Sequence, residues 1–149
     1  MGILLPSVKQ FVQVTPMAVV ELDTGSFEAA IQDNDFVIVD FWAPWCGPCR
    51  SFAPVYDKVS ADFGDIVFAK VNTEDEQEIA AHFQIRSIPT LMIFREQVIV
   101  YAQAGALPEG RFRDLISKAQ SIDMVEAKRQ IAAAQSANDE AGGPPSGPG

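Results

Sequence analysis

The stretch DFWAPWCGPCR, residues 40–50, holds both cysteines of this 149-residue chain, Cys46 and Cys49. Before it, residues 36–43 are nearly all apolar, which is typical of a central strand that is covered on both faces. After Gly47, apolar residues recur every three to four positions, and this spacing predicts an amphipathic helix. The two cysteines are therefore expected at the junction of a strand and a helix.

Such a pair can be a redox pair, half of a metal site, or two ordinary thiols. A structural zinc site needs four ligands, typically in two pairs. The chain offers two cysteines and one histidine, His82, so one copy cannot build a closed site of this kind. We expect no metal, and we assign no chemistry to His82, which is expected at the surface.

The redox interpretation fits the local pattern better. The sulfur of Cys46 is expected near the N-terminus of the helix, where free amides and the helix dipole stabilise a thiolate. The thiolate is the attacking species in disulfide exchange. Cys49 follows one helical turn later, so it faces Cys46 and can close a disulfide. Pro48 stiffens the turn and leaves few amides to over-stabilise the thiolate.

The rest of the chain alternates between strand and helix patterns. Strands are predicted at residues 18–22, 36–43, 65–71, 90–94 and 98–104, and helices at 24–34, 47–63, 74–83 and 108–120. Ser26 is a candidate cap for the first helix. Alternation followed by a hairpin predicts an α/β fold, a mixed sheet with helices on both faces.

The composition of the chain argues against several classes of function. A hydrophobic content of 48% supports a real core, and a net charge of -9 disfavours nucleic-acid binding because such a surface repels phosphates. The N-terminal residues lack the basic start of a signal peptide, and no run approaches the ~20 apolar residues of a membrane span. We expect a cytoplasmic protein with no membrane association, and nothing in the pattern indicates an oligomer, so a monomer is expected.

WCGPC directly after FVIVDFWA, with IPT at residues 88–90, resembles the thioredoxin family over about residues 19–121. Asp40, Lys70, Pro89 and Gly105 stand at the places that the family uses. The resemblance implies the thioredoxin fold, a central mixed five-stranded sheet flanked by four helices, here with a helical C-terminal extension. It also implies a protein-disulfide reductase that acts on disulfide-bearing protein substrates.

The resemblance assigns roles to the cysteines. Cys46 would attack a substrate disulfide and form a mixed disulfide, and Cys49 would break that bond, which leaves a Cys46–Cys49 disulfide. Thioredoxin reductase would reset the pair with electrons from NADPH. No cofactor would be bound to the chain itself, and Gly47 and Pro48 would support the turn.

Asp40 is a carboxylate within an apolar central strand, and burial raises a carboxyl pKa towards neutrality. A group that titrates there can take the proton of Cys49 as that thiol attacks. The family gives this role to the position, through a water. The alternative is a structural acid paired with Lys70; in the first interpretation Lys70 tunes Asp40.

The resemblance also implies a docking surface. The family holds Pro89 in the cis form, which exposes the backbone of Ile88 to pair with an extended substrate. An apolar ring around Cys46 would consist of Trp45, Ile88, Pro89, Ala104 and Gly105. Trp42 is expected to support the core beneath the site, and Arg50 either adds positive charge or is simply solvated.

Some residues depart from the family pattern. Arg95, Glu96 and Gln97 replace the usual glycine turn between the last two strands, which puts the geometry of that hairpin in doubt. Ser87 stands where glycine is frequent, and Ala104 where a larger aliphatic residue is frequent. Both changes can shift substrate preference.

The chain divides into an arm (1–17), the thioredoxin domain (18–121), a helical extension (122–140) and a disordered Gly/Pro tail (141–149). An alternative function is a binding module whose extension docks a partner through a thin stripe of Ile122, Val125 and Ile131. A third is an oxidant or isomerase. It is disfavoured because no signal peptide is visible and because Gly-Pro between the cysteines is typical of reductants.

Overall fold

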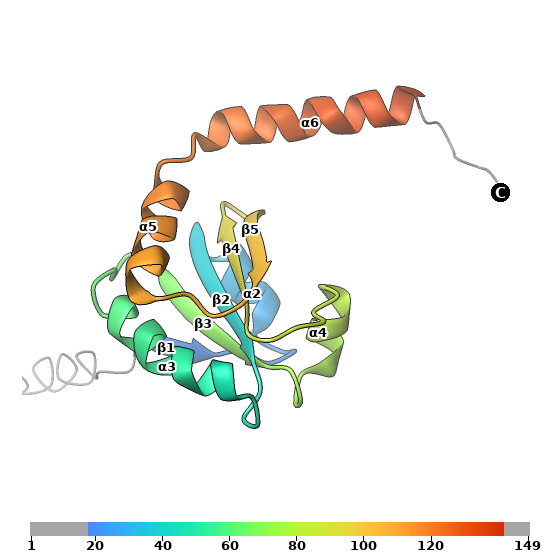
Figure 1. The fold of residues 1–149 in the computed structure, drawn as a ribbon. Coiled ribbons are helices and arrows are strands. Elements are labelled where there is room, and N and C mark those ends of the chain that lie inside the picture. Colours follow the sequence, from blue (N-terminus) through green and yellow to red (C-terminus); the bar gives the residue numbers. More distant parts are fainter. Residues whose placement is uncertain (1–17, 142–149) are drawn as a thin grey trace, which may run out of the picture.

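The computed structural model describes residues 18–141, so the N-terminal arm and the Gly/Pro tail beyond Ala141 lie outside the described residues. A mixed five-stranded sheet forms the centre, in the order β1-β3-β2-β4-β5 (Figure 1). β1 and β2 both pair parallel with β3, whereas β4 pairs antiparallel with β2 and β5. The strands are β1 (Val19–Glu21), β2 (Phe36–Trp42), β3 (Val67–Asn72), β4 (Thr90–Arg95) and β5 (Val98–Ala104).

Helices cover both faces of the sheet, as the sequence predicts. One face carries α2 (Phe27–Gln32) and α4 (Gln77–His82), and the other carries α3 (Gly47–Ser60) and α5 (Glu109–Gln120). Because successive strand residues point to opposite faces, β2 sends Ile38 towards α3 and α5, and Val37 and Val39 towards α2 and α4. This two-sided burial explains the unbroken apolar run of β2, and it places Asp40 on the α3 face.

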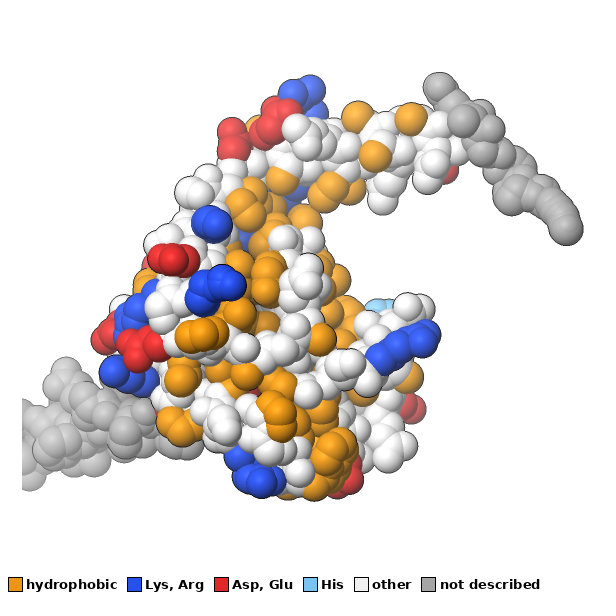
Figure 2. All heavy atoms as spheres, in the orientation of Figure 1, with side chains coloured by type: hydrophobic (Ala, Val, Ile, Leu, Met, Phe, Trp, Pro, Cys, Tyr) orange, Lys and Arg blue, Asp and Glu red, His pale blue; other side chains and the backbone are white. Residues whose placement is uncertain are grey.

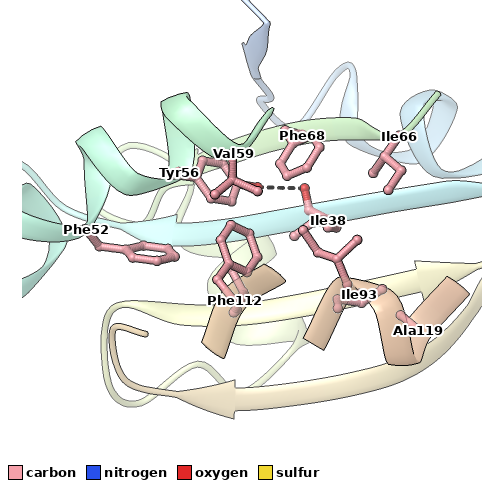
Figure 3. Packing of buried hydrophobic residues seen from close by; sticks show 11 residues of the cluster. Ile38, Phe52, Tyr56, Val59, Ile66, Phe68, Ile93, Phe112 and Ala119 are labelled. Carbon is pink, nitrogen blue, oxygen red and sulfur yellow. Dashed lines mark hydrogen bonds between the residues drawn. The ribbon is translucent and has the colours of Figure 1, made fainter. Parts of the chain in front are cut away.

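Tyr56 is the residue that fixes α3 on the sheet. Its ring is fully buried between Phe52, Phe68 and Phe112 in the core beneath α3 and α5 (Figure 3). Its hydroxyl lies 2.9 Å from the carbonyl oxygen of Ile38 and 2.8 Å from that of Ala69, and it donates its one hydrogen between them. The helix that begins at the cysteines is thereby held to β2 and β3.

The helix predicted at residues 24–34 is shorter, because α2 begins at Phe27. Ser26 stands at the N-cap as expected, but its side chain makes no capping bond. It is engaged with Asp23 instead: the Ser26 amide and hydroxyl both donate to the Asp23 carboxylate, at 2.9 and 3.0 Å. The preceding turn therefore competes successfully for the serine hydroxyl.

The hairpin between β4 and β5 forms without glycine. Its two central residues, Glu96 and Gln97, adopt φ values of 51° and 68°, the left-handed conformation that tight hairpin turns require. The cost, about 1–2 kcal/mol per residue, is offset by contacts with the end of α2. The Gln97 side-chain amide donates to the carbonyl oxygen of Ile31 at 3.1 Å, and the Glu96 amide donates to that of Asp35 at 2.7 Å.

The predicted extension forms one long helix, α6 (Met124–Ala141), which includes the first residue of the expected tail. Its start is fixed to the molecule: Met124 is buried, and the Lys128 ammonium lies 2.8 Å from the Glu96 carboxylate. Beyond this point α6 stands clear of the sheet and its helices (Figure 2), and Val125 and Ile131 are exposed. Within the described residues, no helix is long and apolar enough to span a membrane.

Candidate active site

Cys46 and Cys49 form a disulfide at the end of β2, where the chain enters α3. Cys46 is the N-cap residue and has an extended backbone, while Cys49 lies in the first helical turn. Their Cα atoms are 5.2 Å apart, so the spacing closes the bond that the sequence predicts. Both side chains are almost fully buried.

The helix N-terminus supplies positive potential at Cys46. The Cys49 amide donates to Cys46 Sγ at 3.2 Å, Pro48 contributes no N–H, and the first turn of α3 holds no acidic residue. When the disulfide is reduced, this arrangement favours the thiolate form of Cys46. Arg50 is exposed, and its guanidinium donates to the carbonyl oxygen of Pro44 at 2.9 Å, so it holds the loop before the motif.

A second segment faces the disulfide. The Ile88–Pro89 peptide bond is cis, as the resemblance implies, and the carbonyl oxygen of Ile88 lies 3.8 Å from Cys46 Sγ. Gly105 donates its amide to the carbonyl oxygen of Pro89 at 2.8 Å, and Ala104 pairs with Thr90 at the start of β4. The structure thus brings Ile88, Pro89, Ala104 and Gly105 together at one end of the sheet.

Trp45 completes the rim, with 63% of its surface exposed. Its indole nitrogen donates to the Glu74 carboxylate at 2.7 Å, which ties the aromatic ring to the loop after β3. Sequence reasoning missed Glu74, because the two residues are 29 positions apart and no motif links them.

Trp42 lies beneath the motif and packs against the two cysteines together with Ile88. It is half-buried, as expected of a residue that supports the site from below. The Lys70 ammonium lies 4.5 Å from the centre of its ring, within the range of a cation–π interaction.

Asp40 is buried, with 1% of its surface exposed, and neither carboxylate oxygen has a hydrogen-bond partner within the part of the chain that the structure describes. Burial raises its pKa from 3.8 to about 7, although the Lys70 cation opposes the rise. Glu21 and Asp57 add to it through their negative charges. A carboxyl group in this state can exchange a proton near neutral pH.

The alternative, a structural ion pair between Asp40 and Lys70, finds less support. The two residues are direct neighbours across β2 and β3, yet no contact between their charged atoms within 4.0 Å occurs among the described ion pairs. Glu21 and Asp57 were missed by sequence reasoning, because their proximity to Asp40 depends on strand order and helix packing.

His82 is exposed at the end of α4, as expected. Over residues 18–141, no group of three or more His, Cys, Asp or Glu side chains is arranged to hold a metal ion. The redox-active group that the structure shows is the disulfide.

Comparisons with known proteins agree with this geometry. The family model described as Thioredoxin matches residues 18–118. The chain is 52% identical over 116 residues to "Putative thioredoxin 2" of Streptomyces coelicolor, covering 78% of this chain and 87% of that protein. It is 38% identical over 102 residues to a thioredoxin of Haemophilus influenzae, covering 67% of this chain and 95% of the other.

Solved structures show the same likeness. A Plasmodium falciparum thioredoxin superposes with a TM-score of 0.63 at 33% identity, covering 66% of this chain and 97% of that one. A mutant thioredoxin of Halobacterium salinarum gives a TM-score of 0.65 at 29% identity, covering 72% of this chain and 95% of that one.

Proposed function

This chain belongs to the thioredoxin family and is a thiol-disulfide oxidoreductase, and we propose that it reduces protein disulfides and is itself re-reduced by thioredoxin reductase. The observation that carries the proposal is the Cys46–Cys49 disulfide at the N-terminus of α3, opposite the Ile88–Pro89 segment. We take residues 18–121 as the reductase domain. The pair of sulfurs carries the two electrons, so the chemistry needs no further cofactor on the chain.

In the first step, the Cys46 thiolate attacks one sulfur of a substrate disulfide. A Cys46–substrate disulfide forms, the substrate S–S bond breaks, and the other substrate sulfur leaves as a thiolate. The amide of Cys49 and the dipole of α3 favour the thiolate at Cys46 before the attack. Cys46 is the attacking residue because it occupies the N-cap and its sulfur faces the Ile88 carbonyl, where the substrate backbone docks under this proposal.

In the second step, Cys49 attacks Cys46 Sγ. The mixed disulfide breaks, the second substrate sulfur leaves as a thiolate, and the substrate keeps the two electrons that the cysteine pair gives up on forming the Cys46–Cys49 disulfide. Cys49 must lose its proton as it attacks. Asp40 accepts that proton, because its pKa of about 7 allows both protonation states at neutral pH.

An extended substrate segment docks beside Cys46. Ile88 presents its backbone there, and Ala104 and Gly105, both exposed, provide a small apolar surface that is open in front of Gly105. Pro89 itself is buried and holds Gly105 through its carbonyl oxygen. Trp45 supplies the large aromatic contact, held in place by Glu74. Lys70 supports the site by moderating the charge at Asp40.

Thioredoxin reductase, with electrons from NADPH, returns the disulfide to the dithiol. A reducing compartment such as the cytoplasm suits this cycle, because there the dithiol form is maintained. Under this proposal the chain is an electron carrier in cell redox homeostasis.

The test is NADPH consumption with thioredoxin reductase and insulin as the disulfide substrate. We expect many turnovers per protein molecule, and none with Cys46→Ser or Cys49→Ser. Cys49→Ser should also accumulate a mixed disulfide with the substrate, detectable by non-reducing electrophoresis, whereas Cys46→Ser should not. A protein that is reduced by dithiothreitol but does not turn over with the reductase would overturn the proposed cycle.

A further inference from the structure

Three charged side chains form a row across the sheet on the face that α3 covers. Lys70 of β3 is the direct neighbour of Asp40 in β2 on one side and of Glu21 in β1 on the other. Residues paired across parallel strands point to the same face, so the Lys70 side chain is flanked by an acidic residue on each neighbouring strand. Asp40 is buried, Lys70 is half-buried, and Glu21 is exposed at the edge of the sheet.

We propose that Glu21 is a positioning residue for the second step: it competes with Asp40 for the Lys70 ammonium and so controls how readily Asp40 takes the proton of Cys49. The inference rests on the proposed proton transfer to Asp40. It extends the site to an edge strand on the far side of β3.

The charges in the row explain the competition. Asp40 has no hydrogen bond within the described residues, so the Lys70 cation is its principal source of stabilisation in the charged form. Lys70 is one positive charge shared between two carboxylates, and its ammonium also rests on the Trp42 ring. When Glu21 is ionised, it draws on the same cation and adds its own repulsion. Both effects disfavour the charged form of Asp40.

Other ionisable groups near Asp40, Lys70 and Glu21 also affect the charged form of Asp40, but they do not replace the competition for Lys70. Asp57 of α3 adds negative charge near Asp40, and the buried hydroxyl of Tyr56 on the same helix has a pKa well above its usual value. Partial desolvation raises the pKa of Glu21 against the opposing effects of Lys70 and the Trp42 indole, and Asp75 and Glu76 in the loop after β3 add to the rise. Glu21 therefore links the solvent-exposed edge to the buried acid.

The experiment is a carboxyl ¹³C NMR titration of Asp40 in the oxidised protein, where the cysteines do not titrate. In Glu21→Gln we expect the pKa of Asp40 to fall below its value of about 7, because a negative charge near Asp40 is lost and the Lys70 cation acts on Asp40 alone. Lys70→Gln should shift it upwards, and Glu21→Asp should restore most of the original value. Glu28→Gln, which removes an exposed acid from α2 on the other face of the sheet, is the matched control and should leave it unchanged.

The same variants are then compared in single-turnover release of substrate from the mixed disulfide. We expect the acidic limb of the pH profile to move to lower pH in Glu21→Gln and to stay in place in Glu28→Gln. An Asp40 titration that is identical in Glu21→Gln and the parent protein overturns the inference. Asp40→Asn separates the two proposals: unchanged release in that variant refutes proton transfer to Asp40, whatever Glu21 does to its titration.

Discussion

The Trp45 indole nitrogen donates to the Glu74 carboxylate at 2.7 Å, so the exposed aromatic ring of the motif is fixed to the loop after β3. An exposed side chain that is held in one orientation loses less conformational entropy on binding than a free one. Under the proposed docking mode, Glu74 therefore preorganises Trp45 for the substrate, although it lies far from Trp45 in the sequence.

We expect Glu74→Ala to raise KM for a protein disulfide several-fold with little change in kcat, because Trp45 is released while the sulfur chemistry is untouched. Glu74→Gln keeps an acceptor oxygen and is the matched control, with a smaller effect. A small aromatic disulfide that makes few contacts beyond the sulfurs should be reduced equally by all three proteins. A lowered kcat for Glu74→Ala with both substrates would contradict this role.

The buried acid predicts how stability depends on pH. The folded protein keeps the proton on Asp40 up to about pH 7, whereas the unfolded chain releases it near pH 3.8. Between these values the folded state binds more protons, so the free energy of unfolding should fall as pH rises and level off above about pH 7. The gap of about 3 pH units corresponds to roughly 4 kcal/mol as an upper limit.

Asp40→Asn removes this dependence, because the amide stays neutral. In urea unfolding of the oxidised proteins, the variant should gain stability relative to the parent as pH rises from 5 to 8. Parallel curves for the two proteins over this range would show that Asp40 titrates at its ordinary pKa.

Gly105 and Gly110 offer a paired test of backbone conformation. A Cβ atom added at either position meets nothing within 4 Å, but Gly105 has a φ of 116°, which L-residues rarely adopt. Gly105→Ala should lower the free energy of unfolding by about 1–2 kcal/mol through strain alone. Gly110→Ala, in the first turn of α5, should raise it by about 0.5 kcal/mol through helix propensity.

Because Gly105 is part of the proposed docking surface, its substitution should weaken substrate binding more than the stability loss explains. The measurement is KM at a temperature where both variants are fully folded. Equal KM values for Gly105→Ala and Gly110→Ala would remove Gly105 from the docking surface.

Truncation of the helical extension distinguishes the proposed reductase from the alternative, a binding module that docks a partner through α6. A chain that ends at Arg129 keeps the buried Met124 and the contact between Lys128 and Glu96, so the core stays intact. We expect it to reduce insulin at nearly the rate of the full chain. A large loss of turnover, with unchanged thermal stability, would instead favour a partner that docks on α6.

The sequence was enough to predict the disulfide and the burial of Asp40, because both depend on local spacing. Cys46 and Cys49 are one helical turn apart, and an acid inside a strand with apolar residues on both faces has nowhere exposed to lie. The strand order places β3 between β1 and β2, and no local pattern encodes that arrangement. The second neighbour of Lys70, Glu21 in β1, therefore became visible only in the structure.

The same limit applies to the hairpin turn. Glycine is expected where φ is positive, and the sequence offers Glu96 and Gln97 instead. Contacts with the end of α2, more than sixty positions earlier in the chain, offset the backbone strain. There the carbonyl oxygen of Ile31 accepts a hydrogen bond from the Gln97 side-chain amide. The start of α6 is likewise anchored by Met124, which no periodic pattern singled out, while Val125 stays exposed.

The contact between Lys128 and Glu96 places the start of α6 at the hairpin end of β4 (Figure 1). The disulfide lies beside the opposite end of that strand, next to Ile88. Six residues of strand separate the two ends by about 20 Å, and the 18 residues of α6 extend for about 27 Å. A bead, electrode or reporter coupled along α6 would thus leave the end of the molecule that holds the disulfide unobstructed. α6 therefore serves as a spacer between the domain and a support when the protein is immobilised through this helix.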